Sequence, residues 1–141
     1  MVRVLLIRHA QSMQNEFMEG VSARIARGEL EPSELNATMR NAPALHDAGA
    51  DSPLTELGEQ QAELLGEFYA PLLMEKAREG KLRLFVSPQM RTCQTAAPLY
   101  SRLHQETGIR AAVRVELHEH GPPMHMDNLY APTPPLPLQQ N

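Results

Sequence analysis

The sequence has few of the residues that mark secreted or membrane-bound proteins. Its 141 residues include one cysteine, Cys93, no tryptophan, three tyrosines and three phenylalanines. A single cysteine excludes an internal disulfide and is typical of a reducing compartment. No apolar run approaches the ~18 residues of a membrane-spanning helix, and the run near the N-terminus is too short for a signal peptide. These absences predict a cytoplasmic protein with no membrane partner.

The charged residues do not form a pattern suited to nucleic acid. The chain has 13 Lys and Arg against 17 Asp and Glu, which gives a net charge of −4. A nucleic-acid-binding protein normally carries a basic stripe, whereas the basic residues here are scattered along the chain. We therefore expect no nucleic-acid partner, and the length predicts a single domain.

Three apolar runs predict β-strands. Residues 2–7 read VRVLLI, which is too continuous for a half-exposed strand and predicts a central strand covered on both faces. A second run covers residues 82–86 and ends at Ser87. Residues 111–117 alternate apolar and charged side chains, which predicts a third strand with one more polar face.

The segments between these runs predict two helices. Residues 55–78 begin at Thr55, a good N-cap, and carry glutamates in the first turn, where negative charge favours the helix dipole. Gly80 marks the end of this helix. We expect its apolar face to meet the core; the residues of that face are Leu57, Leu64, Leu65, Phe68 and Leu72. Residues 89–107 predict the second helix, with Gly108 as its C-terminal cap.

Helices between successive strands imply parallel pairing with right-handed crossovers. The expected class is therefore α/β: an open, mostly parallel sheet with helices on both faces. The mixed segment after the first strand could form one or two short surface helices, broken near Gly28. Residues 122–141 hold six prolines, which predicts an extended or disordered tail.

Polar side chains follow each predicted strand. The first strand leads to Arg8, His9, Ser12 and Asn15, the second to Ser87 and Arg91, and the third to Glu119. Ligands of open parallel sheets bind beyond the carboxyl ends of the strands, so we expect these groups to converge on one pocket.

Such a pocket suits phosphoryl chemistry. The guanidinium groups of Arg8 and Arg91 match phosphate oxygens, and Asn15 can donate an amide N–H. His9 could attack phosphorus and carry the phosphoryl group, while Glu119 could protonate the leaving oxygen. The arginines would stabilise the transferring charge, so no metal or cofactor is required.

Ser12 has two readings. It precedes an expected helix, so its hydroxyl could cap that helix. It could equally lie where free backbone N–H groups attract a phosphate, and contribute to that site.

Four motifs carry a resemblance to a known family. The stretch LIRHAQSMQN resembles the RHG-x-S-x-x-N signature of the histidine phosphatase superfamily, which has the phosphoglycerate mutase-like fold. DSPLTELGEQQA, SPQMRTCQTA and LHEHG resemble its next three motifs, in the same order. The resemblance implies that His9 is the phosphorylated nucleophile and Glu119 the proton donor. It also implies that Arg8, Asn15 and Arg91 bind phosphate.

The resemblance also sets the expected domain limits. It assigns residues 1–121 to a histidine phosphatase-like domain with an insertion at about residues 16–50. The family carries a second catalytic histidine, in a His-Gly pair on a later strand, and no such pair follows residue 121. We therefore expect a domain that lacks its C-terminal strands, and the apolar strand edge left open would make it prone to homo-oligomerise.

Three functions remain after these comparisons. The first is hydrolysis of a phosphomonoester, on a phosphorylated small molecule or a phosphoprotein. The second is a non-catalytic phosphate-binding or interaction module, which the lack of a second histidine favours. A mutase-type phosphotransferase is the third and weakest, because the chain has Gln14 where that branch has Trp, and Glu119 is followed by His-Gly.

Overall fold

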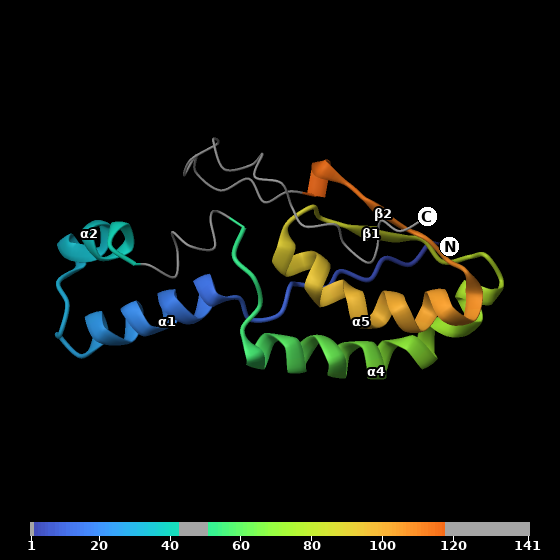
Figure 1. The fold of residues 1–141 in the computed structure, drawn as a ribbon, viewed down its shortest axis with the longest axis horizontal. Helices are drawn as coiled ribbons and strands as arrows, with labels where there is room; N and C mark the ends of the chain where they lie inside the picture. Colours follow the sequence, from blue (N-terminus) through green and yellow to red (C-terminus); the bar gives the residue numbers. More distant parts are fainter. Residues whose placement is uncertain (1, 43–50, 118–141) are drawn as a thin grey trace.

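The computed structural model describes residues 2–42 and 51–117. Figure 1 shows two long helices beneath a short sheet, and a smaller helical arm that projects from one end. The arm comprises α1 (Met13–Ala26), a 3₁₀ turn (Pro32–Glu34) and α2 (Leu35–Arg40). The body comprises α4 (Glu56–Arg78), β1 (Leu84–Val86), α5 (Met90–Thr107), β2 (Ala111–Val113) and a final 3₁₀ turn (Val115–Leu117).

The sheet confirms the expected α/β class. β1 and β2 pair in parallel, with Leu84 opposite Ala111 and Val86 opposite Val113. The connection between them is α5, as the alternation of strand and helix predicted. The third predicted strand is shorter than expected: β2 ends at Val113, and residues 115–117 turn into a 3₁₀ helix.

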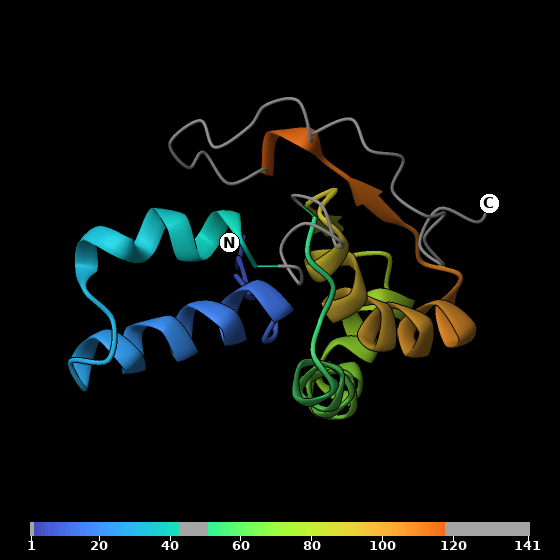
Figure 2. The same ribbon diagram turned by 60° about the vertical axis from the view of Figure 1, so that its left-hand side comes forward.

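The core lies between β1, α5 and α4. Leu103 and Cys93 on α5 are fully buried, and Tyr100 packs with Val86 of β1. On its other side α5 contacts α4 through Leu99 and Leu103. Figures 1 and 2 show α4 and α5 on the same side of the two-stranded sheet. Burial between these three elements therefore supplies most of the hydrophobic stabilisation in the described chain.

The predicted ends of both long helices are confirmed. The Thr55 side chain accepts a hydrogen bond from the Gly58 backbone N–H, which caps α4. Gly108 ends α5 with a left-handed φ of 68°. Pro71 lies inside α4, which continues to Arg78.

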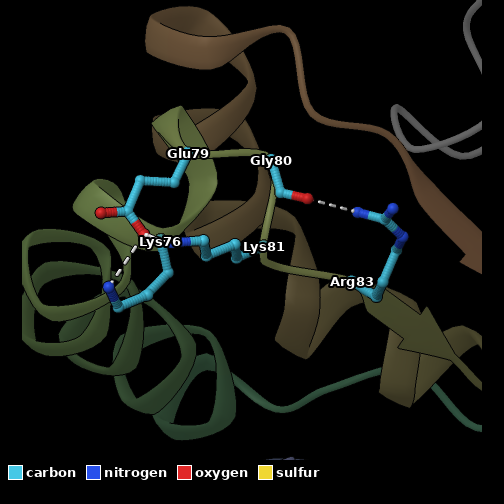
Figure 3. Close-up of polar contacts among 5 residues, drawn as sticks. All are labelled: Lys76, Glu79, Gly80, Lys81 and Arg83. Atoms are coloured by element: carbon cyan, nitrogen blue, oxygen red, sulfur yellow. Dashed lines mark hydrogen bonds and ion pairs between the residues drawn. The ribbon is translucent and has the colours of Figure 1, made fainter.

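The end of α4 is fixed by local polar contacts (Figure 3). Glu79 accepts from Lys76 Nζ at 2.9 Å and lies 3.1 Å from Lys81 Nζ. Gly80 follows with φ 67°, and its carbonyl accepts from Arg83 Nη1 at 2.9 Å. The hydrogen bonds from Lys76 and Lys81 lower the pKa of the Glu79 carboxyl. The positive φ of Gly80 turns the chain from α4 toward β1.

The expected orientation of α4 is wrong. Its buried positions are small residues, namely Gly58, Ala62, Gly66, Ala70 and Ala77. A Cβ on Gly66 would lie 3.0 Å from the Leu99 backbone nitrogen, so this side of α4 approaches the α5 backbone closely. Leu65 is partly buried, while the other four residues of the predicted core face are exposed. The four exposed residues share one helix face, as the pattern predicts, but close approach to α5 requires small side chains. The small residues therefore face α5, and the large ones face solvent.

The prediction of a central strand at residues 2–7 is also wrong. We call these residues the N-terminal segment. They have no strand assignment and their large apolar side chains are exposed. Figure 2 shows the segment standing apart from β1 and β2. Apolar continuity indicates a tendency to be buried, whereas a strand also needs a neighbour that offers backbone donors and acceptors, and no described segment does so.

The expected short helices after the first segment are α1 and α2, with the chain turning at Gly28 as predicted. Val21 is the buried residue of α1, and α2 has none. None of the helices in the described ranges is long and apolar enough to cross a membrane.

Candidate functional site

The candidate site lies where three segments meet, at the N-terminal ends of α4 and α5 and the start of α1 (Figure 1). Residues 10–15 form one segment, residues 51–58 the second, and the first turn of α5 the third. Ser12 and Leu54 form an isolated antiparallel bridge between the first two. Met13 N–H donates to the Pro53 carbonyl, and Thr55 N–H donates to the Gln11 carbonyl, both at 3.0 Å.

Two hydrogen bonds connect the segment after His9 to the α5 turn that carries Arg91. The Ala10 backbone N–H donates to Thr95 Oγ1 at 2.9 Å, and Thr95 Oγ1 donates to the Arg91 carbonyl at 2.6 Å. Ala10, Thr95 and Arg91 are all buried. This connection brings residues more than 80 positions apart to the same end of the molecule.

His9 is partly buried, and its ring is oriented by the backbone of the next residue. Nδ1 lies 2.7 Å from the Ala10 carbonyl oxygen. A carbonyl can only accept, so Nδ1 donates in this contact, and the tautomer that this contact selects has its lone pair on Nε2. Arg8 is exposed next to it.

Ser12 and Asn15 form a reciprocal cap at the start of α1. Ser12 Oγ accepts from the Asn15 N–H at 3.3 Å, and Asn15 Oδ1 accepts from the Ser12 N–H at 3.1 Å and from Ser12 Oγ at 2.9 Å. This geometry is a capping box. The helix-cap reading of Ser12 is confirmed, while a phosphate role for either residue remains a prediction. Because its Oδ1 faces Ser12, Asn15 keeps its amide NH₂ for another acceptor.

The second motif has a structural role that the sequence did not reveal. Asp51 Oδ1 accepts from the Met90 N–H at the start of α5, and Gln94 Oε1 accepts from the Leu54 N–H at 2.9 Å. Two hydrogen bonds therefore connect the loop before α4 to α5, and each segment donates one of them. Sequence patterns indicate caps only from residues next to a helix, whereas this aspartate lies 39 positions away.

Of the two remaining predicted residues, the structure describes Ser87 but not Glu119. Ser87 is buried at the end of β1, and its carbonyl accepts from Thr92 Oγ1 at 2.8 Å. Glu119 lies outside the described residues. Within residues 2–42 and 51–117, no group of three His, Cys, Asp or Glu is arranged to bind a metal.

The comparison with protein families agrees with this arrangement. The family model of the histidine phosphatase superfamily (branch 1) matches residues 4–121. The match spans most of the chain, so the protein belongs to this superfamily. No curated protein and no solved structure matches the chain in the same comparisons. Membership supports a function of the phosphatase or phosphotransferase type.

Proposed function

We propose that the chain transfers a phosphoryl group from a phosphomonoester to His9 and then to water. The observation that supports this most directly is the contact between His9 Nδ1 and the Ala10 carbonyl at 2.7 Å. It leaves the lone pair on Nε2, which makes Nε2 the nucleophile in a neutral imidazole. The family match across residues 4–121 supports a reaction of the phosphatase or phosphotransferase type.

The first step forms a bond from Nε2 to phosphorus and breaks the phosphorus–oxygen bond to the alcohol. The leaving oxygen takes a proton from Glu119, which the family motif suggests as the acid. Arg8, Arg91 and the Asn15 amide would stabilise the charge on the phosphoryl oxygens. In the second step the Glu119 carboxylate takes a proton from water as its oxygen attacks phosphorus. The phosphorus–nitrogen bond breaks, its electron pair returns to Nε2, and inorganic phosphate leaves.

Burial of Arg91 supports its part in this scheme. A buried guanidinium interacts with an anion in a less polar environment than water provides, so each contact to a phosphate is stronger. The Thr95 bridge fixes the α5 turn that carries Arg91 relative to residue 10. Arg8, being exposed, would act from the solvent side of the phosphate.

The first prediction concerns the phosphorylated atom. Incubation with p-nitrophenyl phosphate should give an acid-labile adduct of one phosphoryl group, located on Nε2 of His9 by phosphorus NMR. His9→Ala should remove both the adduct and the release of p-nitrophenol, whereas His104→Ala should remove neither. An adduct on Nδ1, or equal rates for the wild type and His9→Ala, would rule out the mechanism.

The same experiment separates hydrolysis from the alternative of a non-catalytic module. Labelling without continued release of p-nitrophenol would mean that His9 is phosphorylated but that water does not complete the reaction. Phosphate binding without any labelling would assign the chain to the non-catalytic class.

A further inference from the structure

Two rows of large apolar side chains face solvent on this molecule. The first lies on the N-terminal segment, where Val2, Val4 and Leu6 are 88, 77 and 89% exposed. The intervening Leu5 and Ile7 are 49 and 41% exposed. Exposure therefore alternates with the period of two expected for an extended chain. We call Val2, Val4 and Leu6 the N-terminal row.

The second row runs along α4 on the side opposite its small buried residues. It consists of Leu57, Leu64, Phe68 and Leu72, which are 50, 64, 65 and 61% exposed. We call these four residues the α4 stripe. Helix faces of soluble monomers are normally polar where they meet water, so an apolar face of this length indicates a surface that another polypeptide covers.

The two rows have matching spacing. Alternate residues of an extended chain are ~6.6 Å apart, and residues four apart on a helix rise by ~6 Å. The two repeats therefore stay nearly in step over three residues. Each side chain of the N-terminal row can contact one residue of α4, in the pairs Val2, Val4 and Leu6 with Leu64, Phe68 and Leu72. Packing of a helix on the face of an extended segment is the usual contact between layers in α/β proteins.

The charges around the two rows have opposite signs. The N-terminal segment and the residue after it carry Arg3 and Arg8 and no acidic residue. Residues 56–72 of α4 carry four glutamates and no lysine or arginine. Arg102 of α5 pairs with Glu63 and Glu67, so this surface keeps a net negative charge with Glu56 and Glu59. Two α4 stripes facing each other would bring like charges together, and so would two N-terminal segments. A stripe facing an N-terminal segment joins opposite charges, which favours the unlike pairing.

We propose that the protein associates with itself head to tail, the N-terminal row of one copy packing on the α4 stripe of the next. Three side chains of one row meet three of the other, whereas a stable interface has about 20–30 residues on each side. The association is therefore weak. A heterologous contact that does not close into a ring continues to add copies, so the mean mass rises with concentration beyond that of a dimer.

The second prediction tests the pairing with two double variants. Val4→Ser with Leu6→Ser removes the N-terminal row, and Leu64→Ser with Phe68→Ser removes the stripe. All four residues are exposed, so the core is unchanged, which circular dichroism checks. Each variant alone should be monomeric in sedimentation velocity. An equimolar mixture should form a dimer, because the first variant keeps its α4 stripe and the second keeps its N-terminal row. The dimer should grow no further, because no other intact row is left to pair.

The control is Val115→Ser with Leu117→Ser, which removes two exposed apolar residues outside both rows and should associate like the wild type. Self-association of the N-terminal variant alone would assign the contact to two α4 stripes, and that of the stripe variant to two N-terminal segments. Either result overturns the proposal, as does a mixture that stays monomeric or a wild type that is monomeric at all concentrations. None of these outcomes bears on the chemistry of His9.

Discussion

At the residue scale, Cys93 shows how burial controls chemistry. Its side chain is fully buried on α5, and Sγ donates to the Ser87 carbonyl at 3.2 Å. Desolvation raises the pKa of the thiol from 9.0 to about 11, despite the hydrogen bond with Thr92 that acts in the opposite direction. A thiol with this pKa is largely protonated at neutral pH, which agrees with the absence of Cys93 from the proposed mechanism.

The third prediction follows from this pKa. Between pH 9 and about 11 the unfolded chain loses the thiol proton while the folded chain keeps it. The free energy of unfolding should therefore fall across this window, by about 2–3 kcal/mol from this group. Denaturant unfolding at several pH values measures the slope.

Cys93→Ala is the control for this pH dependence. It removes the titrating group, so its stability should depend less steeply on pH above 9, although it is less stable at neutral pH because of the cavity it leaves. Identical slopes for the two proteins would contradict the cause assigned here.

At the element scale, small residues decide how α4 packs. Gly58 is in the first turn of α4, and a Cβ there would lie 2.0 Å from the Gln11 carbonyl oxygen. That oxygen accepts from the Thr55 N–H. Gln11 directly follows Ala10, whose backbone N–H donates to Thr95 Oγ1 on α5. The contact at Gly58 therefore presses the start of α4 against the segment that carries His9.

The fourth prediction concerns this contact. Gly58→Ala should destabilise the protein by ~1–3 kcal/mol, because the Cβ meets backbone that must shift. It should also slow phosphorylation of His9, since the shifted backbone is two residues from it. Thermal unfolding and the labelling rate measure the two effects.

Gly20→Ala is the matched control, because nothing lies within 4 Å of a Cβ at that position of α1. This substitution should increase helix stability by up to ~1 kcal/mol, as alanine does in an exposed helix. A Gly58→Ala protein as stable and as reactive as the wild type would show that the close approach has no consequence.

At the scale of the whole molecule, stability is unevenly distributed. α4, α5 and β1 share the core clusters, whereas α1 buries one residue and α2 none. Figures 1 and 2 show α1 and α2 extending away from the α4–α5 pair. Elements with few buried contacts open at lower free energy than the core.

The fifth prediction is a graded pattern of amide hydrogen exchange. Amides in the middle of α5 and along its side of α4 should exchange slowest, and those of α1 and α2 should exchange many times faster. Mass spectrometry of peptic peptides resolves these segments. Equal protection of α1 and α5 would mean that the arm unfolds together with the body.

Local signals predicted most of the body of the fold. Neighbouring residues predict the N-cap of α4 at Thr55 and the turns at Gly28, Gly80 and Gly108. They also predict a strand over residues 82–86, of which residues 84–86 form β1. These features depend on backbone conformation and capping within a few positions, so the sequence reports them directly. The motif order likewise predicted the superfamily, which the match over residues 4–121 confirms.

Contacts between distant segments were decided only by the tertiary structure. Residues 2–7 are apolar enough for a central strand but have no partner in the described chain, and α4 turns its large side chains outward because glycine and alanine allow α5 to come close. The Thr95 bridge and the Asp51 cap join residues 85 and 39 positions apart. Sequence therefore determined which helices and turns form and which chemistry the motifs belong to. Which faces are buried, and which side chains meet at the site, depended on the space and hydrogen-bonding groups that remote segments provide.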